Sequence, residues 1–125
     1  MPLGTVLLLS TAVVCGIVLA LWHLRPDQTR PNPPWPIGIL HGALGISGLG
    51  ALIVLLQGPR RGDAMGVGSF GTAAAWLFAA AIAAGLTIPF LIRRFRTGAG
   101  VAIAVHASLA IIGYVLLLAW TSMGF

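Results

Sequence analysis

Residues 37–57, IGILHGALGISGLGALIVLLQ, carry no charged side chain and include one histidine, His41. The run is long enough to cross the hydrocarbon core of a bilayer as an α-helix, which takes about 20 apolar residues. A helix suits that environment because it satisfies its backbone hydrogen bonds internally. This stretch therefore predicts a membrane-spanning helix with a polar side chain inside it.

Three further apolar runs predict three more spans, at about 3–24, 70–92 and 99–121, with a tight turn over 94–98. Of the 125 residues, 58% are hydrophobic and only 7% are charged, whereas soluble domains average roughly 25% charged residues. This balance excludes a soluble globular domain, and the length suits one compact unit. We expect residues 1–125 to form a single all-α domain, an integral membrane four-helix bundle.

The arginines lie between the predicted spans and give the chain a net charge of +5. This distribution is typical of membrane-protein loops and argues against a nucleic-acid partner. The segments after the first and third spans hold most of them: Arg25, Arg30, Arg93, Arg94 and Arg96. The positive-inside rule then predicts that these segments are cytoplasmic and that both termini lie outside, as in a bacterial inner-membrane protein.

The second and fourth runs share an octet that starts with histidine. It is HGALGISG from His41 to Gly48 and HASLAIIG from His106 to Gly113, an offset of 65 residues. A fainter echo relates 4–5 in the first run to 71–72 in the third, both Gly-Thr. The chain is thus expected to be two repeated transmembrane hairpins, related by an axis along the membrane normal because each has an even number of spans.

The repeat places both histidines at a similar depth, roughly 7–11 Å below one face at about 1.5 Å of rise per residue. Ionisable residues inside a span usually face the bundle interior and mark function. Small residues share the helix face of each histidine: Gly45 and Gly48 with His41, Ala110 and Gly113 with His106. Such faces leave room for a flat apolar group, and neutral imidazoles are suitable axial ligands of haem iron.

The pattern therefore predicts one haem b with His41 and His106 as its metal ligands. Each ligand ring would donate its other N–H to a helix carbonyl or to water, most simply to the carbonyl one turn back on its own helix, that of Ile37 or Ala102. The propionates would face the nearer membrane surface, where Arg25 and Arg93 lie among the other loop arginines.

With its predicted spans, matched histidines and neighbouring glycines, the chain resembles small four-helix membrane b-type cytochromes, of the cytochrome b561-like and respiratory membrane-anchor type. The resemblance implies electron transfer, as a subunit that exchanges electrons with quinone or with redox protein subunits, rather than catalysis by this chain alone. It departs from the larger members in having only two histidines predicted to be buried, which implies one haem.

Several alternatives stay open at this point. The two histidines also fit a structural or proton-handling pair, or a site for another metal. Glycines on helix faces are common in membrane bundles without cofactors. A cofactor-free subunit that stabilises a membrane complex, and a small transporter, are therefore the competing functions. His23 has no counterpart in the repeat and fits an interfacial residue, or a hydrogen-bond donor to a quinone or to a haem propionate.

Overall fold

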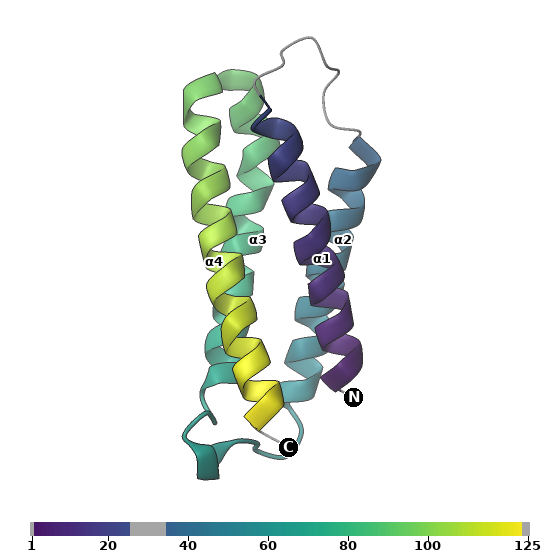
Figure 1. Ribbon diagram of the computed structural model, residues 1–125, viewed down its shortest axis with the longest axis vertical. Helices are drawn as coiled ribbons and strands as arrows, with labels where there is room; N and C mark the ends of the chain where they lie inside the picture. Colours follow the sequence, from purple (N-terminus) through teal and green to yellow (C-terminus); the bar gives the residue numbers. More distant parts are fainter. Residues whose placement is uncertain (1, 26–34, 124–125) are drawn as a thin grey trace.

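The computed structural model of the protein describes residues 2–25 and 35–123 (Figure 1). Within these residues it contains four long α-helices and one short 3₁₀ helix: α1 (Pro2–His23), α2 (Trp35–Leu56), η1 (Asp63–Met65), α3 (Phe70–Arg94) and α4 (Arg96–Met123). Each long helix has the length and hydropathy to cross a membrane. The predicted all-α transmembrane bundle is confirmed.

The helix ends differ from the expected spans by a few residues, most at the connection between α3 and α4. A turn was expected over 94–98, but only Phe95 leaves the helical conformation, with φ −140° and ψ 95°. Its N–H still donates to the carbonyl of Leu91 at 2.7 Å. The predicted tight turn is present but shorter than expected, because one extended residue is enough to reverse the chain there. The two helices consequently pack against each other from the connection onward.

The bundle consists of two closely packed helix pairs, α1 with α2 and α3 with α4. Contacts between the pairs run from α2 to α3 and from α1 to α4, and are fewer. The helices therefore follow one another around the bundle, which leaves α2 and α4 diagonally opposite (Figure 1). Each pair corresponds to one of the two hairpins that the sequence repeat predicts.

Burial repeats between the hairpins as well. Leu9 and Ala12 are buried on α1, the first helix of the first hairpin. On α3, the first helix of the second hairpin, the buried residues Phe78 and Ala81 occupy the equivalent positions, at an offset of 69 residues. In the second helices the buried pair is Leu52 and Leu117, at the 65-residue offset of the octets. The two hairpins thus present equivalent faces to the bundle interior, as the repeat predicts.

The packed core occupies only the half of the bundle nearer η1. Its buried members are Leu9, Leu52, Val67, Ala74, Phe78, Leu117 and Trp120. In the other half, on the side of the α3–α4 connection, Ala99 is the buried residue among those the structure describes. Protein interiors normally pack as densely as organic crystals. The half beyond Ala12 and Ala81 is therefore the less buried half of the bundle.

Candidate functional site

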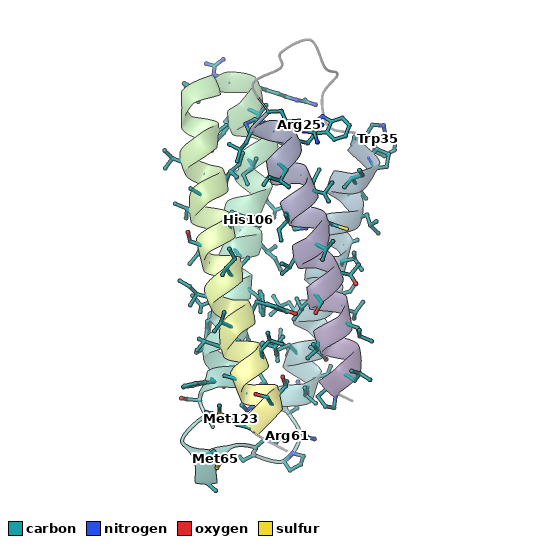
Figure 2. The ribbon with its side chains drawn as sticks, viewed as in Figure 1. Arg25, Trp35, Arg61, Met65, His106 and Met123 are labelled. Carbon is teal, nitrogen blue, oxygen red and sulfur yellow. The ribbon has the colours of Figure 1, made fainter. Side chains whose placement is uncertain are left out.

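The side chains of His41 on α2 and His106 on α4 meet across the diagonal of the bundle. Their ring centroids are 5.8 Å apart and the ring planes are inclined at 79°. Both rings are half-buried. Figure 2 shows His106 between the Arg25 end of the bundle and the Arg61 end. The structure therefore brings together the two histidines that the repeated octet singled out.

Each imidazole is held by the other helix of its own hairpin. His41 Nδ1 lies 2.8 Å from the carbonyl oxygen of Ala12, and His106 Nδ1 lies 2.7 Å from that of Ala81. A carbonyl oxygen can only accept, so each Nδ1 carries the hydrogen and donates it. In a neutral ring this leaves Nε2 with a free lone pair, which is the tautomer that a metal-ligating imidazole needs.

The acceptors differ from those expected from the sequence, which were the carbonyls of Ile37 and Ala102. That prediction was wrong because each ring reaches sideways to the neighbouring helix instead of back along its own. A glycine makes this approach possible. A Cβ added at Gly16 would lie 2.8 Å from His41 Cε1, and one added at Gly85 would lie 2.9 Å from His106 Cε1.

The sequence contained a signal for these partners that the octets did not reveal. Ala12 and Gly16 are four residues apart on α1, as Ala81 and Gly85 are on α3. The alanine supplies the acceptor carbonyl and the glycine, one turn later, supplies the space for the ring. This Ala-x-x-x-Gly repeat has an offset of 69 residues, whereas the Gly-Thr echo has an offset of 67.

The small residues expected beside the imidazoles have different surroundings. A Cβ added at Gly48 would meet the Leu9 side chain at 2.6 Å, and one at Gly113 would meet Leu77 at 3.2 Å. Both glycines therefore pack within their own hairpins. Gly45 lies one turn from His41, and a Cβ added there would meet no described atom within 4 Å. Its counterpart on α4, Ala110, is half-buried.

The predicted basic residues lie at the end of the less buried half of the bundle, near the α3–α4 connection. Arg25 follows α1, Arg93 lies in the last turn of α3, and both are exposed. The Arg25 guanidinium carbon is 5.8 Å from the centroid of the Trp22 ring, which is a cation–π distance. His23 is exposed at the same end. Arg30 and the side chain of Arg96 lie outside the described part of the chain.

The donor set limits what the site can hold. Within the described residues, no three His, Cys, Asp or Glu side chains gather around one metal position. Two imidazoles alone fit an ion whose other ligands come from a cofactor, as the four equatorial nitrogens of haem do. With metal–nitrogen bonds of about 2.0–2.1 Å, two opposed imidazoles have centroids roughly 6.4 Å apart. The observed 5.8 Å is a direct edge-to-face ring contact and is slightly shorter than this spacing.

No protein-family model matches this chain, and neither the curated proteins nor the solved structures include a match. Function is therefore inferred from the two imidazoles and from the residues that orient them.

Proposed function

We propose that this protein is a membrane electron-transfer protein that binds one haem b through His41 and His106. The observation that carries the proposal is the pair of imidazoles at 5.8 Å, each with its Nδ1 hydrogen donated to a carbonyl of its own hairpin. Iron held there would supply one-electron chemistry. Because His41 and His106 would both hold the iron, transfer of electrons would be favoured over binding of a substrate to the metal.

The chain's own residues would orient and tune this site. The carbonyls of Ala12 and Ala81 would fix the tautomer and rotation of the rings, so that Nε2 keeps its lone pair. Gly16 and Gly85 keep the space that the rings occupy. The less buried half of the bundle would offer apolar surroundings to the haem. Arg25 and Arg93 at its end would offer positive charge to the haem propionates.

The proposed partners follow from the setting. The spans place the site within lipid, and the described loops are too short to fold as redox domains. We therefore propose that quinone or a docked redox subunit exchanges electrons with the site. The arginine-rich segments are proposed to face the cytoplasm of a bacterial inner membrane, with both termini outside.

A visible spectrum of the purified protein, reduced minus oxidised, tests the proposal. We expect sharp b-type bands that vanish in His41→Ala and in His106→Ala. His23→Ala is the matched control, because His23 is exposed and has no equivalent in the second hairpin. Colourless wild-type protein from cells supplied with haem contradicts the proposal.

The second candidate is a cofactor-free structural subunit, favoured by the same ring contact. Nearly perpendicular rings at 5.8 Å also suit direct edge-to-face packing. The two histidines would then only tie the hairpins together. This function predicts no visible bands, and it predicts that phenylalanine at both positions preserves the assembled protein.

A further inference from the structure

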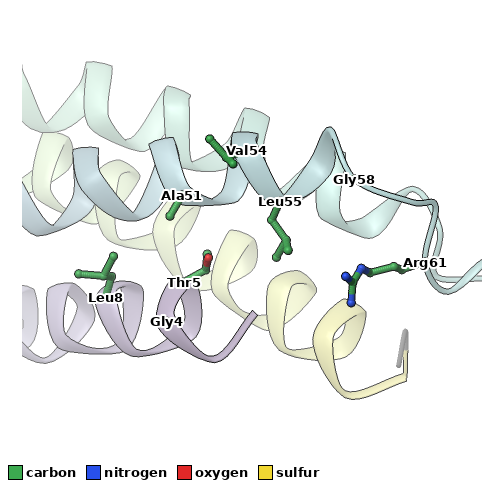
Figure 3. A pocket seen from close by; sticks show the side chains of 8 residues that line it. All are labelled: Gly4, Thr5, Leu8, Ala51, Val54, Leu55, Gly58 and Arg61. Atoms are coloured by element: carbon green, nitrogen blue, oxygen red, sulfur yellow. The ribbon is translucent and has the colours of Figure 1, made fainter. Parts of the chain in front are cut away.

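A cavity of about 470 Å³ lies at the η1 end of the bundle, between the start of α1 and the end of α2 (Figure 3). Leu8 on α1 and Ala51, Val54 and Leu55 on α2 make most of its wall apolar. Thr5 in this wall lies seven positions before Ala12, the acceptor for His41, which is about 10 Å along the helix at 1.5 Å per residue. The cavity is therefore separate from the paired imidazoles.

One polar side chain of a spanning helix lies inside this apolar cavity. Thr5 is only 3% exposed and lines the wall, and Figure 3 shows its hydroxyl oxygen between α1 and α2. Among the residues that the structure describes, its hydroxyl has no hydrogen-bond partner. The cavity thus offers one donor to an incoming acceptor atom.

A second, more polar cavity of about 400 Å³ adjoins the first. The two share Leu55 and Arg61 in their linings. Arg60, Ser69 and Thr72 also line the second cavity, and Asp63 is the carboxylate that reaches it. An apolar cleft along a spanning hairpin thus continues, past one arginine, into a pocket with two arginines and one acidic side chain.

We propose that these joined cavities bind one anionic phospholipid. An acyl chain would lie along Leu8, Val54 and Leu55, and the phosphate would lie between the guanidinium groups of Arg60 and Arg61. Arginine is suited to this task because its planar fork of donors matches two phosphate oxygens. Basic pockets between spanning helices are known to bind anionic headgroups. The positive charge that the exposed Arg60 brings to the pocket favours a net anionic lipid over a zwitterionic one. The Thr5 hydroxyl would donate to an ester carbonyl.

Lipid binding by the purified full-length protein tests this inference. Native mass spectrometry in detergent would count retained lipids during matched titrations with phosphatidylglycerol and phosphatidylcholine. We expect one tightly bound phosphatidylglycerol, with affinity reduced about fivefold for each arginine in Arg60→Gln and Arg61→Gln. Thr5→Val, which has nearly the same shape, should reduce affinity severalfold. The matched control is Arg93→Gln with Arg94→Gln, which removes two positive charges at the opposite end.

A specific lipid site differs in these measurements from general lipid adhesion and from a free-anion site. Equal affinity for the two lipids, or an equal loss in the Arg93 and Arg94 control, overturns the inference. Displacement of the lipid by millimolar inorganic phosphate overturns it too, because the pocket would then be a free-anion site. Circular dichroism and elution volume identify a variant that fails to fold, and Thr5→Val then provides the test without a change in charge. Haem absorbance should be unchanged in Thr5→Val, Arg60→Gln and Arg61→Gln, so the two proposals can fail independently.

Discussion

His41 and His106 face each other from diagonally opposite helices, with ring centroids 5.8 Å apart and planes inclined at 79°. Among the described residues, neither ring has a hydrogen-bond partner in the other hairpin. Each donates its Nδ1 hydrogen to the adjacent helix of its own hairpin, at Ala12 or Ala81. Each hairpin therefore orients its histidine by itself, and association of the hairpins brings the two rings together.

The glycines under the rings give a direct test of that orientation. We expect Gly16→Ala or Gly85→Ala to remove most of the b-type absorbance, because the new Cβ would lie 2.8–2.9 Å from the imidazole. The measurement is haem absorbance per protein after purification. Gly50→Ala is the matched control, since its Cβ meets no described atom within 4 Å.

Helix propensity sharpens this prediction. Replacing glycine by alanine inside a helix would by itself favour the helix by up to about 1 kcal/mol. The control should therefore be as stable as the wild type or more so. Full haem content in Gly16→Ala and Gly85→Ala would contradict the proposed role of the glycines.

The sequence was sufficient to predict the spans and the pair of histidines. Long uncharged runs determine spans by themselves, and the repeated octet places His41 and His106 at matched positions. What it could not predict is helix rotation. Small residues occur all around these apolar helices, so sequence spacing does not decide whether Gly48 faces a cofactor or Leu9. The acceptors Ala12 and Ala81 depend on the same rotation.

Arg25 and Arg93, at the end of the bundle near the α3–α4 connection, should influence the redox potential of the proposed haem. Positive charge near iron favours the reduced state, so Arg25→Gln and Arg93→Gln should each lower the midpoint potential, on the order of tens of millivolts. A spectroelectrochemical titration measures this shift. Arg60→Gln serves as the control because Arg60 lies at the opposite end of the bundle. A comparable shift in Arg60→Gln would show a general charge effect instead of a local one.

Packing inside each hairpin should affect stability rather than ligation. At Gly48 an added Cβ would lie 2.6 Å from Leu9, a side chain that is almost fully buried. Overpacking of this kind costs about 1–3 kcal/mol. We expect Gly48→Ala to lower the thermal unfolding midpoint in detergent while the haem-to-protein ratio of the folded fraction stays the same. A loss of haem without a loss of stability would instead place Gly48 at the cofactor.

A polar contact joins the two hairpins below the imidazoles. Ser10 Oγ donates to the Val6 carbonyl at 2.7 Å, so the Tyr114 hydroxyl, 2.5 Å away on α4, donates to Ser10. Tyr114→Phe removes this donor and keeps the ring. Because hydrogen bonds between membrane helices contribute about 0.6 kcal/mol on average, we expect a small loss of stability by reversible unfolding in mixed micelles. Ser10→Ala should lose a similar amount, and the double variant should lose no more than either single one. Additive losses would show that the two hydroxyls act independently.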